Sequence, residues 1–228
     1  MAIPFSPAQL VAAARQYGTP LWCYDAATIQ ARIAQLQAFD VVRYAQKASS
    51  NLHLLRLIRE AGVRVDAVSL GEIERALLAG FSPVDAGIVF TCDLFDEATL
   101  ARVVELQVEV NTGSIDMLRQ LGEKSPGHRV WLRINPGFGH GHSRKTNTGG
   151  ENSKHGIWHD QMSEALAVIR QHGLHLVGLH MHIGSGVDYD HLEQVGAAMV
   201  AAVKSLDHDL EAFSIGGGLS TPHREGDT

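Results

Sequence analysis

Cysteine is scarce in this sequence: only Cys23 and Cys92 occur among 228 residues, and they lack the spacing of a metal site. We therefore expect a reduced, cytoplasmic protein. No apolar run reaches the length of roughly 18 residues that a membrane span needs, so we expect no membrane association. The first ten residues, MAIPFSPAQL, lack the basic and apolar regions of a secretion signal.

Positive charge is also in short supply. The chain has 19 Lys and Arg residues against 25 Asp and Glu residues, which gives a formal net charge of -6 and a pI near 6.1. A nucleic-acid-binding protein usually presents a basic face, so this balance argues against a nucleic-acid partner.

What the chain does have is apolar residues in a regular pattern. They make up 45% of the sequence, enough to build a sizeable core for one large domain or two small ones. Short apolar runs alternate with helical periodicity, which predicts a parallel sheet with crossover helices. The expected strands are 41–45, 63–68, 88–91, 108–111, 130–134, 176–181 and 212–215. The expected helices are 7–17, 26–38, 52–61, 72–79, 97–105, 115–121, 162–172 and 192–206.

Most strand–helix units repeat about every 20 to 25 residues, which suits a TIM-type (β/α) barrel at least as well as an open sheet. The fold class that we predict is therefore α/β, with a (β/α)8 barrel. Only about seven strands can be found, whereas a closed barrel needs eight. Either one strand is hidden in the sequence, or the sheet opens at an edge, or the chain is a fragment.

One connection is unusually long. Residues 135–158 read NPGFGHGHSRKTNTGGENSKHGIW, rich in glycine, asparagine, serine and histidine. A loop of this length inside a compact domain is usually a functional lid or binding loop, and a disordered insertion is the alternative.

Barrel enzymes carry their chemistry at the carboxyl ends of the strands. Reading only those positions gives a short set of candidates. Three consecutive glycines after the last strand would let backbone amides approach an anion, although a tight turn also explains them. The set is Lys47, Asp66, Arg133, Asn135, His180, His182, Ser185, Gly216, Gly217 and Gly218.

Several candidates have a plainer explanation. His180 and His182 would share one strand face and suit a zinc pair, but Asp66 is the only clear carboxylate near them, so we expect no metal. Lys47 could be a solvated residue after a strand. Glu72 follows Ser69 in a capping-box pattern and is more simply structural than catalytic.

Taken together, the candidates indicate a pyridoxal phosphate site. Lys47 can form a Schiff base with the aldehyde, an imidazole can stack on the ring, and the glycines can hold the phosphate. An amine in this role should be partly buried, so we expect Lys47 to be partly buried at its strand end.

The sequence also resembles the diaminopimelate decarboxylase family, pyridoxal-phosphate enzymes of the alanine-racemase-like barrel class. Five stretches carry the resemblance and span nearly the whole chain. The long polar loop is the most specific of them, because related decarboxylases and racemases share the lysine and the glycines but not the loop. The stretches are VVRYAQKASSN, VDAVSLGEIERALLAGF, HRVWLRINPGFGHGHSRKTNTGGENSKHGI, HMHIGSGVDY and SIGGGLS.

The resemblance implies a role for each matching residue. Lys47 would be the Schiff-base lysine, and His182 would stack on the pyridine ring. Gly216, Gly217 and Gly218 would bind the phosphate, with Ser185 near its end. Asp66 and Arg133 would support the lysine and the ring, and the loop from 140 to 155 would cover the substrate.

The implied reaction converts meso-2,6-diaminopimelate to L-lysine and carbon dioxide, the last step of lysine biosynthesis. This is the work of an amino-acid decarboxylase, a carbon–carbon lyase, and the family implies a cytoplasmic homodimer. Three alternatives remain at this point. The first is a non-catalytic pyridoxal-phosphate-binding single-barrel protein of cofactor homeostasis, and the second is a metal-dependent barrel hydrolase built on His180 and His182. The third is a decarboxylase of the same class acting on ornithine, arginine or a carboxylated polyamine.

Members of that family are nearly twice as long as this chain. Compared with those members, residues 1–228 would correspond to the N-terminal barrel domain without its last strand, and the C-terminal β-domain would be absent. We therefore expect a fragment that is inactive or binds the cofactor weakly.

Overall fold

The computed structural model describes residues 4–139, 147–186 and 188–218. Its strands form a parallel sheet in the order β1-β2-β3-β4-β5-β7-β8, and β6 pairs with β5 off this path. The strands are β1 Arg43–Ala45, β2 Arg64–Ala67, β3 Ile88–Cys92, β4 Glu109–Thr112, β5 Arg129–Asn135, β6 Ile157–Trp158, β7 His175–His180 and β8 Ala212–Ser214.

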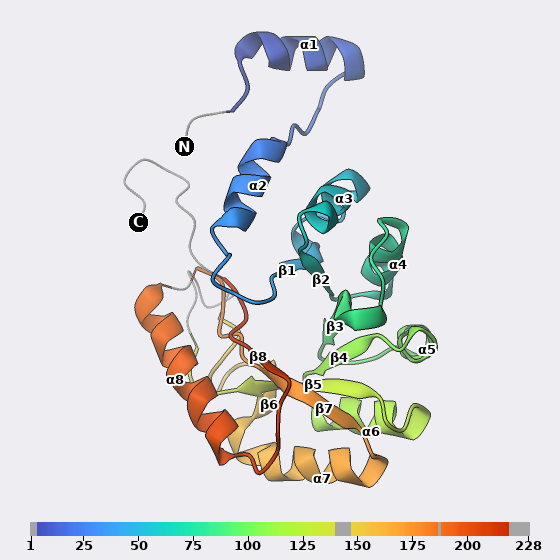
Figure 1. Cartoon of the computed structure of the whole chain (residues 1–228), viewed down its shortest axis with the longest axis vertical. Coiled ribbons are helices and arrows are strands. Elements are labelled where there is room, and N and C mark those ends of the chain that lie inside the picture. Colours follow the sequence, from blue (N-terminus) through green and yellow to red (C-terminus); the bar gives the residue numbers. More distant parts are fainter. Residues whose placement is uncertain (1–3, 140–146, 187, 219–228) are drawn as a thin grey trace.

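Helices connect these strands and lie outside them, so that α3 to α8 surround the sheet (Figure 1). The helices are α1 Pro7–Tyr17, α2 Ala26–Ala34, α3 Leu52–Glu60, α4 Leu70–Leu78, α5 Glu97–Leu106, α6 Ile115–Lys124, α7 Met162–His172 and α8 Tyr189–Ser205. Short 3-10 turns lie at Gln46–Ala48, Val84–Ala86 and His159–Gln161. Parallel strands require crossover connections of this kind, usually through a helix.

Side-chain caps explain where most of the helices begin. Seven of the eight helices follow a serine, aspartate or asparagine whose side-chain oxygen accepts a hydrogen bond from an amide of the first turn. Such residues satisfy amides that have no partner inside the helix. The exception is α7, which continues directly from a 3-10 turn and has no side-chain cap.

The two faces of the sheet differ in chemistry. Successive side chains along a strand point to opposite faces. The outward set is apolar and packs against the helices as one core, for example Val65, Phe90 and Leu132. The inward set on the same strands contains the polar and charged side chains, including Asp66 on β2 and Arg133 on β5, together with Val89 and Trp131. The fold therefore lines the inside of the curved sheet with groups that can bind a ligand.

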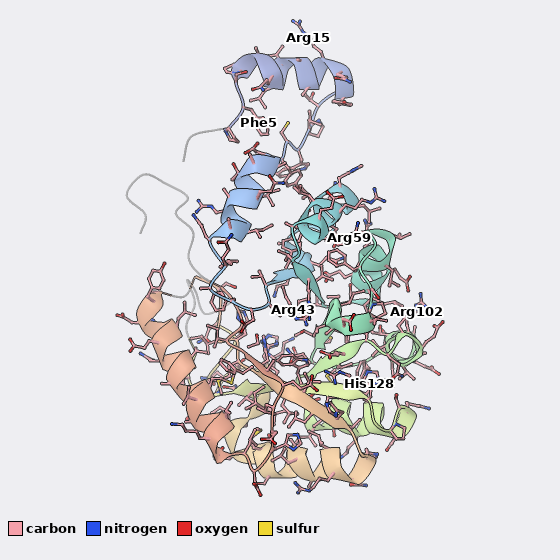
Figure 2. All side chains as sticks on the ribbon, in the orientation of Figure 1. Phe5, Arg15, Arg43, Arg59, Arg102 and His128 are labelled. Carbon is pink, nitrogen blue, oxygen red and sulfur yellow. The ribbon has the colours of Figure 1, made fainter. Side chains whose placement is uncertain are left out.

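Ion pairs and hydrogen bonds hold the amino-terminal end of this inner face. Glu109 is buried, and its carboxylate accepts hydrogen bonds from Arg129 at 2.7 Å and from Trp131 at 2.9 Å. Arg129 also pairs with Glu211 at 2.7 Å. In Figure 2, Arg43 lies near the middle of the molecule, whereas Arg15 on α1 points away from it.

The seven strands expected from the sequence are all present, which confirms the α/β barrel-type fold and its incomplete strand number. The two-residue strand β6 was missed because it is too short to show a periodicity. Within the described residues β1 and β8 pair with one neighbour each, so the sheet is an open half-barrel. Among these same residues, no helix is both long and apolar enough to cross a membrane.

Candidate cofactor-binding site

Lys47 lies in the 3-10 turn that follows β1, at the carboxyl end of the strand. Its neighbour Gln46 is completely buried and donates a hydrogen bond to the backbone oxygen of Glu72 at 2.9 Å. Ser50 donates to the backbone oxygen of Gln46 at 3.3 Å. The turn is thus pinned on both sides of Lys47. Lys47 itself is exposed, so the expectation of partial burial was wrong: the chain has left the strand before it reaches the amine.

Electrostatic contacts bring the other candidates close to Lys47. Its charge partly offsets the rise that burial causes in the pKa of Asp66, and adds to the lowering that burial causes in the pKa of His182, so all three groups lie in one region. Arg133 is 8% exposed and lies near Asp66, near His180 at the end of β7 and near His182 just after it. The structure therefore gathers the strand-end residues that the sequence singled out.

The two histidines at the end of β7 are held in the neutral form. Burial, followed by the charges of Arg133 and Lys47, lowers the pKa of His182 to about 4. Burial likewise brings the pKa of His180 well below its usual value. His180 Nδ1 lies 3.0 Å from the hydroxyl of Ser214. A neutral imidazole loses less hydration than a charged one when an aromatic ring stacks on it, so His182 is suited to that contact.

Asp66 on β2 is the register partner of Ala45 on β1, two residues before Lys47. Burial raises its pKa to about 6, although a hydrogen bond from Thr91 and the charges of Lys47 and Arg43 act in the opposite direction. Thr91 in turn accepts a hydrogen bond from Asn111 Nδ2 at 3.2 Å.

Two of the three glycines after β8 have a backbone conformation that other residues rarely adopt. Gly218 has φ +96°, and a Cβ there would lie 2.1 Å from the backbone oxygen of Gly184. Gly216 has φ +74°, and its amide donates to Ser214 Oγ at 3.2 Å. The Gly217 amide donates to His182 Nδ1 at 3.4 Å. The turn therefore lies directly against the candidate ring-stacking histidine.

Ser185 and the long polar loop complete the surroundings. Ser185 is exposed, and its Cα lies 3.2 Å from the position of a Cβ built on Gly218. The loop returns to the segment just after β7, where Thr148 donates to the backbone oxygen of His182 at 3.0 Å. Residues 140–146, which the resemblance assigned to covering the substrate, lie outside the described residues.

Glu72 has the structural role that the sequence indicated. Ser69 Oγ accepts a hydrogen bond from the Glu72 amide at 3.3 Å, as in a capping box. The Glu72 carboxylate accepts from the amide of Val68 at 2.8 Å, one residue before the cap. It therefore stabilises the start of α4.

This set of residues fits pyridoxal phosphate. An amine is available on an exposed side chain, a neutral imidazole lies beside it, and a turn of three glycines would lose its shape if any Cβ filled Gly216 or Gly218. Within the described residues no group of three or more His, Cys, Asp or Glu side chains is arranged to hold a metal ion.

The sequence did not reveal every residue near the site. Asp93, just beyond β3, pairs with His155 Nδ1 and lies 3.7 Å from Arg133 Nη1. Thr91 and Asn111 were missed as well, although each lies on the inward face near a strand end. Their positions near strand ends could have identified Thr91 and Asn111 as site residues. They were missed because the sequence prediction favoured titratable side chains and glycines, and both residues are neutral.

Comparisons with known proteins identify the family. A family model described as the pyridoxal-binding domain of pyridoxal-dependent decarboxylases matches residues 26–228. A diaminopimelate decarboxylase of Streptomyces coelicolor is 65% identical over 221 residues, which are 96% of this chain and 50% of that protein. The diaminopimelate decarboxylase of Escherichia coli K12 is 65% identical over 214 residues, covering 93% of this chain and 51% of the relative.

Solved structures agree with the sequence matches. A crystal structure of a diaminopimelate decarboxylase superimposes with a TM-score of 0.93 at 63% identity, covering 97% of this chain and 53% of that one. The Helicobacter pylori diaminopimelate decarboxylase, complexed with L-lysine, gives a TM-score of 0.84 at 28% identity, covering 96% and 59%. The chain spans about half the length of the curated relatives that it matches. It belongs to the pyridoxal-dependent decarboxylase family, and residues 26–228 are its pyridoxal-binding domain.

Proposed function

We propose that the protein to which this chain belongs decarboxylates meso-2,6-diaminopimelate to L-lysine and carbon dioxide. The observation that carries the proposal is the 65% identity to diaminopimelate decarboxylases across 96% of the chain. The L-lysine bound by the Helicobacter pylori relative is the product of such a reaction.

Pyridoxal phosphate, when bound, supplies an electron sink for the carbon whose carboxylate is lost. In our proposal Lys47 holds the cofactor aldehyde covalently and is the catalytic residue of this chain. The pinned turn from Gln46 to Ser50 keeps the amine at the strand end.

The remaining residues bind and orient the cofactor in this proposal. His182 stacks on the ring in its neutral form, and Arg133 and Asp66 provide charge on the inner face. Gly216, Gly217 and Gly218 contact the phosphate through their backbone, with Ser185 beside them. These assignments are those expected from the resemblance.

The domain assignment is also a proposal. We infer that residues 1–228 are the N-terminal barrel domain of a longer protein, without its last barrel strand and its C-terminal β-domain. That longer protein would be a cytoplasmic homodimer. The 228-residue chain alone would be inactive or bind the cofactor weakly, because half of the site's surroundings would be missing.

A visible absorbance titration of the purified chain with pyridoxal phosphate tests the cofactor site. We expect a saturable band from the lysine-linked cofactor, lost in Lys47→Ala and retained in Lys204→Ala, which removes an amine in the last turn of α8. A band that persists in Lys47→Ala would refute the role of Lys47.

The substrate is tested with the chain joined to the second half of a relative. We expect carbon dioxide release from meso-2,6-diaminopimelate and not from ornithine or arginine. Release from ornithine or arginine instead would favour another decarboxylase of the class. Cofactor binding with no release from any of the three would favour a homeostasis protein.

A further inference from the structure

Three inward-facing side chains on neighbouring strands are joined by consecutive hydrogen bonds, which we call the Asn111–Thr91–Asp66 relay. Asn111 on β4 donates to Thr91 on β3 at 3.2 Å, and Thr91 donates to Asp66 on β2. Thr91 and Asn111 are direct partners in the strand register, and Asp66 pairs with Val89, two residues before Thr91. Because side chains two apart share a face of a strand, all three groups lie on the same inner face.

The direction of this chain of hydrogen bonds follows from the donors. A hydroxyl has a single proton, whereas a side-chain amide nitrogen can only donate. Since Asn111 Nδ2 donates to Thr91 Oγ1, the Thr91 proton is directed to Asp66 Oδ1. Such a donor stabilises a carboxylate over a carboxylic acid. Asn111 is 3% exposed and Thr91 is half-buried, so water does not replace either partner easily.

The other Asp66 oxygen is left for the site. Within the part of the chain that the structure describes, no hydrogen bond reaches Asp66 Oδ2. The charged groups around the carboxylate come from four elements: Lys47 after β1, Arg43 on β1, Glu72 on α4 and Arg133 on β5. Three of the four are cations, and Glu72 is engaged in capping α4.

We propose that Thr91 and Asn111 are positioning residues, which together hold Asp66 as an anion beside Lys47. The proposal rests on the proposed role of Lys47 in binding the cofactor. An anion at this position stabilises positive charge on the Lys47 nitrogen. Thr91 and Asn111 act only through Asp66, so their loss changes the charge of Asp66 without removing any group that binds the cofactor.

Loss of the Thr91 hydrogen bond should raise the pKa of Asp66 by a measurable amount. Asp66 has a pKa of about 6, and the Thr91 hydrogen bond is the largest influence that lowers it. A hydrogen bond to a charged group corresponds to about one pKa unit or somewhat more, so Thr91→Val should raise the Asp66 midpoint by about one unit. At pH 7 the neutral fraction of Asp66 would then rise from roughly a tenth to roughly half.

Carbon-13 NMR titration of the aspartate carboxyl groups in the full chain measures this shift directly, with Asp66→Asn to assign the signal. We expect Thr91→Val to raise the midpoint, Thr91→Ser to restore it because the donor returns, and Asn111→Ala to give a smaller rise. Thr112→Val is the matched control: Thr112 lies on β4, is fully buried and donates to the Trp131 backbone oxygen at 2.8 Å. An unchanged midpoint in Thr91→Val, or an equal rise in Thr112→Val, would overturn the proposal.

A cofactor titration separates this inference from the proposed function. At pH 7, Thr91→Val should bind pyridoxal phosphate about twofold more weakly than the parent, because the ionised fraction of Asp66 falls from about nine-tenths to about half. The difference should vanish at pH 8.5, where Asp66 is ionised in both. A parent chain that gives no absorbance band would contradict the cofactor proposal for this chain. The carboxyl titration would still show whether Thr91 and Asn111 hold Asp66 as an anion. A band in the parent, with equal affinity in Thr91→Val at pH 7, would overturn the positioning role of Thr91 and leave the cofactor proposal standing.

Discussion

At the scale of single residues, the three consecutive glycines are not equivalent. Gly216 and Gly218 have positive φ angles, and a Cβ on either would collide with a backbone oxygen of the segment after β7. Gly217 has ordinary φ and open space around its Cα. Two of the glycines are thus required by the backbone itself, before any ligand is considered.

This difference predicts unequal effects of alanine. Gly218→Ala should lower the free energy of unfolding by about 1–3 kcal/mol, because both the left-handed backbone and the contact with Gly184 become unfavourable. Gly217→Ala should change it by less than about 0.5 kcal/mol. Urea unfolding followed by circular dichroism gives both values, and equal losses in the two variants would contradict the described turn.

At the scale of elements, one side chain joins both described ends of the long polar loop. Asn135, the last residue of β5, is 3% exposed. Its Oδ1 accepts hydrogen bonds from the amides of Gly137 at 3.1 Å and Gly150 at 2.9 Å. Its Nδ2 donates to the Gly150 oxygen at 3.0 Å. The loop therefore leaves and rejoins the barrel at the same point.

Removing this junction should loosen the returning segment. Asn135→Ala should cost about 2–3 kcal/mol of folding free energy, because buried backbone groups lose their partners. Hydrogen exchange at the Gly150 amide should accelerate more than exchange in β4. Asn152→Ala, at an exposed position of the same loop, should change stability by no more than about 0.5 kcal/mol. Unchanged exchange at Gly150 in Asn135→Ala would show that the loop is held by other contacts.

At the scale of the whole molecule, the sheet has two edges. In the described residues β1 pairs only with β2, and β8 pairs only with β7. Phe213 on β8 is 63% exposed. Unpaired strand edges and exposed apolar groups favour association with a second chain. The same openness distinguishes this chain from a closed eight-stranded barrel.

We therefore predict that the purified chain self-associates as its concentration rises. Phe213→Lys should shift sedimentation velocity profiles toward the monomer, because a charge on an edge strand disfavours edge pairing. Tyr189→Lys, which replaces an exposed aromatic side chain on α8, serves as the control and should leave the profile unchanged. A parent chain that stays monomeric at every concentration would contradict the prediction.

The sequence alone determined the succession of elements. Apolar runs located the seven main strands because outward-facing residues such as Val65 and Leu132 must pack against helices. The capping-box pattern of Ser69 and Glu72 marked the start of α4, because the Ser69 oxygen satisfies a free amide of the first turn. The strand-end candidates followed from that order, since parallel strands end at one edge.

Only the tertiary structure decided which groups meet. The pair of Asp93 and His155 joins residues 62 positions apart, and the relay from Asn111 through Thr91 to Asp66 crosses three strands. Lys47 proved exposed because the chain turns before reaching it, which no local pattern records. Periodicity along a strand fixes the face on which a side chain lies, whereas its neighbours across the sheet depend on register, and register is set by the packing of the whole chain.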